Sequence, residues 1–260
     1  MKLIFGAHLS LSDMKYLNGV VESCGCRALQ IFISNPRSFH PVFSKSSSEN
    51  YTKLRSELDL KVCVHMPYIV NLASTDESLR EKSVEHVISA IGSAAAFGMD
   101  YYIVHPGSGP VDKLKSSVDE IVSKTKKLGT RFLIENTEGS GRKLMSSEPE
   151  ILDFLKNYKK DEVGICWDTA HAFGAGVDTG KLSLKFRSFI KVVHLNDSKV
   201  EFNSKKDRHE SFGAGLIGEK TIAAFIRLFK DDVVYIVERE GYENTCRDLK
   251  FIAKIGSGVK

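Results

Sequence analysis

Eight short apolar runs recur along the chain, and their spacing limits the possible fold more than any other feature of the sequence. They start at residues 3, 28, 61, 101, 131, 163, 190 and 233, so 25 to 43 residues separate one start from the next. Such an interval holds one strand, one helix and two loops. The runs are LIFGA (3–7), ALQIFI (28–33), KVCV (61–64), YYIV (101–104), RFLI (131–134), VGIC (163–166), IKVV (190–193) and VVYIV (233–237). Each run is predicted to be a strand.

The segments between the runs carry helix signals. Residues 74–98 open with hydroxyl and carboxylate side chains and continue with apolar residues at a spacing near 3.6. Residues 146–158 combine a serine, an early proline and an apolar face, and residues 218–230 and 243–255 have similar apolar stripes. The polar stretch 44–50 reads as a loop or a helix cap. Eight alternating units predict an α/β protein, a (β/α)₈ TIM barrel.

Composition agrees with one intracellular domain covering residues 1–260, because no linker or low-complexity tract marks a boundary. A net charge of +4 is read as a solvated surface and does not establish a polyanionic partner. The five cysteines are odd in number and lack a C-x-x-C pair, which favours reduced thiols and a cytoplasmic location. No apolar stretch approaches the ~18 residues of a membrane span, and the N-terminus does not resemble a secretory signal.

Metal-binding residue types stand at the predicted strand ends. In a TIM barrel the active site lies at the carboxyl ends of the strands. Those ends here carry His8, His65, His105, Glu135, Asp168 with His171, His194 and Glu238. Five of the eight histidines therefore fall at this one face. A lone histidine there is usually just hydrogen-bonded at the rim. A converging set of charges, however, is costly without bound cations, so we favour a metal centre.

A further segment supplies two more donors. KDRHESFGAGLIG (206–218) follows the seventh run and offers Asp207 and His209, which alternate in an extended chain and so point the same way. Glycines then allow a tight loop into the last helix. The nine candidate ligands are His65, His105, Glu135, Asp168, His171, His194, Asp207, His209 and Glu238. Because one zinc takes three or four protein ligands, nine ligands with one bridging carboxylate suit three ions.

At this point the chain resembles the endonuclease IV family, the zinc-dependent apurinic/apyrimidinic endonucleases of base-excision repair. The resemblance runs from the first strand to the last. The matching motifs are GAHLS (6–10), VHMPYIVNLAS (64–74), VHPGS (104–108), IENTEG (134–139), CWDTAHAFGAG (166–176), VVHLNDS (192–198) and DRHESFGAGLIG (207–218). The last motif is specific to the family.

The resemblance implies three zinc ions per chain, with Mn²⁺ able to replace zinc at some positions. The first zinc would take His65, His105 and Glu135. The second would share Glu135 and add Asp168, His194 and Glu238, and the third would take His171, Asp207 and His209.

The reaction implied is hydrolysis of the phosphodiester 5′ to an abasic site in double-stranded DNA, which leaves a 3′-hydroxyl and a 5′-deoxyribose phosphate. Trimming of 3′ ends is also expected. Zinc lowers the pKa of bound water to about 7, and paired metals clamp the attacking and leaving oxygens. Glu238, together with the bridging Glu135, is expected to be catalytic. Glu238 is the best candidate to orient or deprotonate the attacking water. The protein is expected to act as a monomer.

Three residues are expected to contact DNA. SNPRSF (34–39) resembles the family's DNA-penetrating loop, with Arg37 in the inserting position, and Tyr68 and Ile69 stand at a second wedge. Wedges of this kind kink duplex DNA. The chain departs from the family pattern at Arg239, where a smaller neutral residue is expected. Phe39 stands where Trp is common, and Ile69 stands where Leu is common. His8 is expected to support the site from behind, His86 to lie on the surface and His40 in a loop.

Two other classes of protein fit part of the pattern. A sugar isomerase or epimerase of the xylose-isomerase-like barrels would bind one or two metal ions, and the additional set of His171, Asp207 and His209 disfavours it. A non-catalytic metal- or DNA-damage-binding protein is disfavoured by the complete ligand set. Counting bound metal and testing for nicking of an abasic duplex would separate the three.

Overall fold

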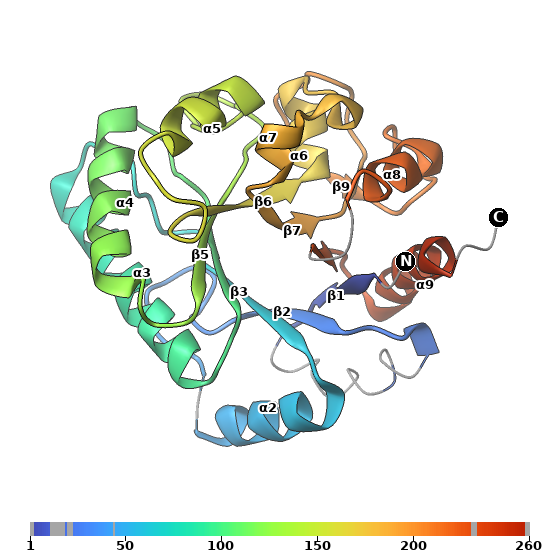
Figure 1. Ribbon diagram of the computed structural model, residues 1–260, viewed down its shortest axis with the longest axis horizontal. Coiled ribbons are helices and arrows are strands. Elements are labelled where there is room, and N and C mark those ends of the chain that lie inside the picture. The colour runs from blue at the N-terminus through green and yellow to red at the C-terminus, as the bar shows by residue number, and fades with distance from the viewer. Residues whose placement is uncertain (1–2, 11–18, 20–22, 44, 230–232, 258–260) are drawn as a thin grey trace.

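The eight predicted runs form one closed barrel of parallel strands in the computed structural model, which describes residues 3–10, 19, 23–43, 45–229 and 233–257 (Figure 1). Around the barrel the order is β1, β10, β7, β6, β5, β4, β3, β2. The strands are β1 (Ile4–His8), β2 (Ala28–Phe32), β3 (Lys61–His65), β4 (Tyr101–Val104), β5 (Arg131–Glu135), β6 (Gly164–Asp168), β7 (Ile190–His194) and β10 (Val234–Val237). The predicted TIM barrel is confirmed.

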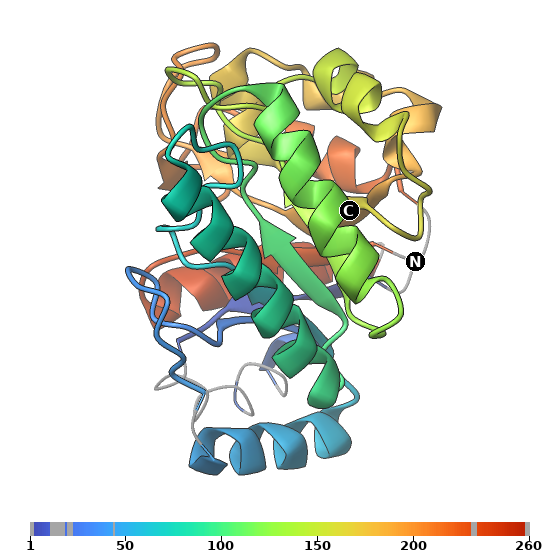
Figure 2. The same cartoon turned by 90° about the vertical axis from the view of Figure 1, so that its left-hand side faces the viewer.

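Helices surround the barrel. They are α2 (Lys45–Leu58), α3 (Glu77–Ala96), α4 (Val111–Thr125), α5 (Glu148–Leu155), α6 (Thr169–Ala175), α7 (Leu184–Arg187), α8 (Glu219–Ile226) and α9 (Tyr242–Gly256), with a 3₁₀ turn η2 (Thr179–Lys181). In Figure 2 the long helices α3 and α4 lie side by side against the outside of the strands. No helix among the described residues is long and apolar enough to cross a membrane.

The helix limits follow from local chemistry. Asp76 caps α3 by accepting a hydrogen bond from the Leu79 amide at 3.2 Å. The chain leaves α3 through Gly98, whose φ of +66° disfavours a side chain. The prediction of a loop or cap at 44–50 was wrong for the described part, because residues 45–50 open α2. Tyr51 is buried within the same helix, and such tertiary packing outweighs the weak helix propensity of the serines before it.

One layer of the barrel interior is entirely apolar. Six strands contribute one side chain each and β10 contributes two, and these side chains pack against one another. The layer consists of Ala28, Cys63, Ile103, Leu133, Cys166, Val192, Val234 and Ile236. Gly164 leaves room for it, because a Cβ there would stand 2.6 Å from Leu133 Cδ2. Side chains of one strand alternate between faces, so the residue two positions further along points into the barrel again.

A small antiparallel hairpin rises beside the barrel and was not predicted. It pairs β8 (Asp197–Ser198) with β9 (His209–Glu210). The buried Asp197 carboxylate fixes the loop between β9 and α8, because it accepts a hydrogen bond from the Ile217 amide at 2.9 Å. The φ angles of Gly213 (+83°) and Gly218 (+81°) confirm that glycine is needed where the loop turns toward α8.

Candidate metal centre

The nine predicted ligands meet at the carboxyl end of the barrel. Six of them stand two residues beyond a member of the apolar layer, on the same side of the strand. These pairs are Cys63 and His65, Ile103 and His105, Leu133 and Glu135, Cys166 and Asp168, Val192 and His194, and Ile236 and Glu238. His171 lies in α6, and Asp207 and His209 come from the chain that returns between β8 and α8.

Glu135 is the centre of the first group. Its carboxylate is only 1% exposed, and Oε2 lies 3.1 Å from His65 Nε2 and 3.8 Å from His105 Nε2. Its other oxygen, Oε1, lies 3.0 Å from His194 Nδ1 and 3.4 Å from His171 Nδ1. The carboxylate thus presents its two oxygens to different imidazoles, as a bridging ligand must.

A second group surrounds His194. Donor atoms of Asp168, His194 and Glu238 all lie within 4.8 Å of one another, and His194 Nδ1 is 3.4 Å from Glu238 Oε2. Asn196 ties the two carboxylates together. Its Nδ2 donates to Asp168 Oδ2 at 2.7 Å and to Glu238 Oε2 at 3.3 Å.

The third group joins α6 to the hairpin. Asp207 lies between two imidazoles, with Oδ2 3.2 Å from His171 Nε2 and Oδ1 3.1 Å from His209 Nε2. Asp168 also reaches this group, because its Oδ2 is 3.7 Å from His209 Nε2. The N-terminus of α6 fixes the position of Asp168 relative to His171, because Asp168 Oδ1 caps the helix by accepting a hydrogen bond from the His171 amide at 2.7 Å.

Backbone carbonyl oxygens orient the rings. His65 Nδ1 lies 2.8 Å from the Met66 carbonyl and His171 Nδ1 lies 2.9 Å from the Asn136 carbonyl. His209 Nδ1 lies 3.3 Å from the Glu238 carbonyl. Since a carbonyl accepts only from a proton donor, we infer that these three rings carry a proton on Nδ1 and turn Nε2 inward. Metal-binding histidines are usually held in this way.

Charges at this mouth favour cation binding. Burial lowers the pKa of His105 to about 4, so this ring is neutral near pH 7. Burial alone would raise the pKa of Glu135, but the imidazoles of His194 and His105 lower it well below the usual range. Burial likewise opposes ionisation of Glu238, but His194 and the hydrogen bond with His8 outweigh it and lower the pKa of that carboxyl. Burial alone would lower the pKa of His209 and His171, but the neighbouring carboxylates raise that of His209 to about 9 and that of His171 well above its usual value. Neutral imidazole and ionised carboxylate are the forms that bind zinc, so zinc would displace a proton from these two rings.

Two buried donor atoms of the ligand set lack hydrogen-bond partners among the described residues, and both belong to the third group. They are Asp207 Oδ1 and His209 Nε2, which face each other without hydrogen-bond geometry. Buried polar atoms are seldom left in this state. A divalent ion between the carboxylate and the imidazoles would satisfy them. The donor set of histidines and carboxylates therefore fits transition-metal ions such as zinc.

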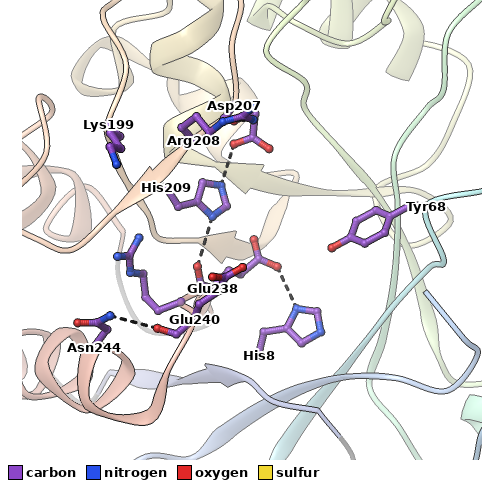
Figure 3. A pocket seen from close by; sticks show the side chains of 10 residues that line it. His8, Tyr68, Lys199, Asp207, Arg208, His209, Glu238, Glu240 and Asn244 are labelled. Atoms are coloured by element: carbon purple, nitrogen blue, oxygen red, sulfur yellow. Dashed lines mark hydrogen bonds and ion pairs between the residues drawn. The ribbon is translucent and has the colours of Figure 1, made fainter. Parts of the chain in front are cut away.

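A cavity of about 610 Å³ opens beside the metal ligands (Figure 3). Asp207, His209 and Glu238 form part of its wall, and Lys199, Arg208 and Arg239 form another part. Tyr68 points its hydroxyl toward the Glu238 carboxylate from the far side. The cavity thus places positive side chains next to the ligands, where an anionic group can be held.

The predicted DNA-contacting residues lie at the rim of this mouth. Arg37 is exposed, Tyr68 is 65% exposed and Ile69 is 40% exposed. The Tyr68 amide donates to the Pro36 carbonyl at 2.7 Å, which joins the segment of Arg37 to that of Tyr68 and Ile69. The loop after β2, which carries Arg37, thus lies beside the loop after β3, which carries Tyr68 and Ile69.

Sequence reasoning missed three amides that hold the ligands. Gln30 is fully buried, donates to Glu238 Oε1 at 2.8 Å and lies with Oε1 2.8 Å from His194 Nε2. Asn136 and Asn196 contact Asp168. The signal for Gln30 was present, because it is the only glutamine in the chain and interrupts an apolar strand.

The remaining histidines have different surroundings. His8 supports the site as expected, with Nδ1 3.2 Å from Glu238 Oε1. The expectation that His86 is a surface residue was wrong. Its Nε2 lies 3.3 Å from Ser34 Oγ, and its ring packs against Phe39 at 5.2 Å between centroids. His86 projects from α3 under the loop of Arg37, so the loop covers it. His40 is exposed in that loop, as expected.

Comparison with known proteins decides the family. The model of the xylose isomerase-like TIM barrel family matches residues 19–255. The probable endonuclease 4 of Persephonella marina is 35% identical over 244 residues, which cover 85% of each chain. The chain belongs to the endonuclease IV family. The resemblance inferred from the motifs is confirmed, and an endonuclease is a phosphodiester hydrolase.

Solved structures agree with the family assignment. The crystal structure of endonuclease IV from Thermus thermophilus matches with a TM-score of 0.82 and 30% identity, covering 98% of this chain and 100% of that one. A D-tagatose 3-epimerase-like protein matches with a TM-score of 0.77, covering 99% and 98% of the two chains. At 20% identity this second likeness shows a shared barrel only. Endonuclease IV and this epimerase-like protein thus share one fold, so the fold alone does not assign an activity.

Proposed function

We propose that the protein is an apurinic/apyrimidinic endonuclease that hydrolyses the phosphodiester 5′ to abasic sites in double-stranded DNA. The products would be a 3′-hydroxyl and a 5′-deoxyribose phosphate, and 3′-end trimming would occur at the same site. The main support is the convergence of all nine donors at one barrel mouth in a chain that is 35% identical to a probable endonuclease 4.

Three zinc ions per chain would fill the centre, with Mn²⁺ able to replace zinc at some positions. His65, His105 and Glu135 would hold the first ion. Glu135, Asp168, His194 and Glu238 would hold the second, and His171, Asp207 and His209 the third. The short contacts around Glu135 support its role as the bridge, and the unsatisfied atoms of Asp207 and His209 support an ion between them.

Zinc, when bound, supplies an acidified water and positive charge for the leaving oxygen. Glu238 contributes an ionised carboxylate, because His194 and His8 keep its pKa low in spite of burial. Its Oε1 is held by Gln30, so the opposite oxygen faces the ligand group. We assign Glu238 to orienting and deprotonating the attacking water. Glu135 fixes the distance between the two ligand groups that share it.

Substrate choice would come from DNA deformation, because an abasic site has no base to recognise. Unpaired nucleotides are the cheapest to turn out of the helix. The exposed edge of Arg37, Tyr68 and Ile69 stands beside the mouth and suits a wedge that kinks the duplex. The cavity beside the ligands would receive the turned-out sugar and its phosphate. The protein is expected to do this as a monomer.

A duplex that carries a tetrahydrofuran abasic analogue tests the proposal. This analogue cannot undergo β-elimination, so cleavage by the zinc-loaded protein must be hydrolytic. The expected product has an extendable 3′-hydroxyl, and about three zinc ions per chain accompany the activity. A protein that binds a single ion and leaves the duplex uncut would instead support the sugar isomerase alternative. A protein that binds the metals and the duplex without cutting would support a binding function.

A further inference from the structure

Arg239 is a largely buried arginine beside the proposed metal ligands. It directly follows Glu238 at the end of β10, and its side chain is only 11% exposed. A guanidinium this deeply placed needs anionic partners, because burying an unpaired charge is costly. Two carboxylates supply them.

The partners of Arg239 come from two different elements. Its Nη2 donates to Glu210 Oε1 at 3.1 Å, in β9. Its Nε lies 3.7 Å from Asp248 Oδ2, in α9. The Asp248 carboxylate is 1% exposed, and its Oδ2 accepts no hydrogen bond from the described residues. The charge of Arg239 is therefore the main compensation for that oxygen.

Both carboxylates also hold the backbone that follows His209. Glu210 Oε1 accepts from the Ser211 amide at 2.9 Å, and Asp248 Oδ1 accepts from the Phe212 amide at 3.2 Å. Arg239 thus neutralises two groups that grip consecutive amides of one segment. That segment begins at His209, one of the donors to the third ion.

A second link runs parallel to this one. His209 Nδ1 lies 3.3 Å from the carbonyl of Glu238. Glu238 therefore contacts His209 through its backbone carbonyl, and Arg239 contacts Glu210 through an ion pair. The separation between the end of β10 and the hairpin is fixed at two neighbouring points.

We propose that Arg239 is a positioning residue that locks the Asp207–His209 segment onto the end of β10 and so sets the affinity for the third metal ion. The proposal rests on the proposed metal centre. Arginine suits the task because its rigid planar fork holds two carboxylates in a fixed geometry, whereas the compact ammonium of lysine on its flexible stem does not.

Substitutions at Arg239 test the link. Arg239→Gln removes the charge, and Arg239→Lys keeps it without the fork. Arg227→Gln is the matched control, because Arg227 is exposed at the C-terminal end of α8 and belongs to no ligand group. Two quantities are measured on zinc-equilibrated protein. They are zinc retained per chain under a chromophoric chelator, and hydrogen exchange of the Ser211 and Phe212 amides.

We expect Arg239→Gln to release one zinc ion roughly 10- to 100-fold more readily than the wild type, while the other two stay bound. Arg239→Lys should give an intermediate value, and Arg227→Gln should match the wild type. Exchange at Ser211 and Phe212 should accelerate only in the Arg239 variants. Unchanged exchange in Arg239→Gln would overturn the proposal whatever the zinc count, and so would equal loss of all three ions. A wild type that binds fewer than three ions would refute the proposed centre instead, a separate result from the exchange data. If Arg239→Gln does not fold, Arg239→Lys carries both measurements.

Discussion

Two layers of the same barrel, two residues apart along the same strands, have opposite chemistry. The inner layer contains only apolar side chains, such as Leu133 and Val192. The next layer toward the carboxyl ends contains ionisable groups on the same strands, including Glu135 and His194, both at most 1% exposed. Side chains of both layers point into the barrel for the same reason, which is the alternation of side chains along a strand. Only the residue types differ.

The layers differ in what stabilises them. Apolar side chains stabilise the fold by leaving water and need no specific partner. Buried carboxylates and imidazoles require mutual hydrogen bonds or a cation. The side-chain amides of Gln30 and Asn196 satisfy part of this need. The unsatisfied atoms of Asp207 and His209 mark where amides do not reach. The ionisable layer therefore suits ligand binding better than stability. Substitutions there should change metal binding or activity, and substitutions in the apolar layer should change the free energy of unfolding.

The largest expected effect is at Glu238. Glu238→Gln should lower the single-turnover rate of abasic-site cleavage by about 10³-fold, because the amide cannot take the proton of the attacking water. Binding of the uncut abasic duplex should largely survive. Glu240→Gln is the control, since Glu240 lines the same cavity but is exposed. A near-normal rate in Glu238→Gln would remove Glu238 from the catalytic role.

A substitution in the apolar layer should do the reverse. Leu133 is fully buried two residues before Glu135, and Leu133→Ala should lower the free energy of unfolding by about 3 kcal/mol through lost contacts and a cavity. Zinc content should stay unchanged. Leu128→Ala, at a site that is 41% exposed, should cost far less. Denaturant titration and metal analysis of both variants give the comparison. Loss of zinc from Leu133→Ala would show that the two layers are coupled.

The sequence predicts the barrel and the ligand layer because both depend on local patterns. Polar residues stand at or within two positions beyond the ends of the strand runs, and parallel strands carry these ends to one face. The resemblance to the family supplies the proposed division of the nine donors among ions, including Asp207 and His209 in the return segment. This part of the prediction needed no knowledge of packing.

The parts that failed depend on contacts between distant segments. Residues 45–50 were expected to form a loop or cap but open α2, where the buried Tyr51 decides the helix. His86 was expected at the surface because its helical neighbours are charged, but the loop carrying Ser34 and Phe39 packs over it. Gln30 supports two ligands that are 164 and 208 residues away in the chain. No local pattern reports such partners.

Gln30 lies at the boundary between the layers. Gln30→Leu keeps the size of the side chain but leaves His194 Nε2 without its partner and Glu238 Oε1 with His8 alone, so both ligands are held less firmly. Supporting groups of this kind are typically worth 10- to 100-fold in metal affinity. We expect a loss of that size, measured by zinc competition with a chelator. Ile31→Val, in the same strand, should leave zinc affinity unchanged. Equal affinity in Gln30→Leu would show that strand geometry alone orients the ligands.

The smallest expected effect separates DNA contact from chemistry at the rim. Arg37 is exposed and belongs to no ligand group, so Arg37→Ala should leave zinc content unchanged. It should weaken binding to abasic duplex by roughly tenfold, a usual size for loss of an anchoring side chain. A wedge makes its contacts only in kinked DNA, so intact duplex should be affected less.

Salt titrations with abasic and undamaged duplex distinguish the wedge from a simple phosphate contact. A phosphate contact would weaken both duplexes equally and lower the salt slope by about one charge. Arg227→Ala is the control, because Arg227 is exposed at the C-terminal end of α8, and the helices of a βα barrel run back to the face opposite the mouth. This control should change neither titration. Equal losses of affinity for the two duplexes with Arg37→Ala would show that Arg37 is a nonspecific surface charge. Only a side chain inserted at the lesion can discriminate between a duplex that kinks easily and one that does not.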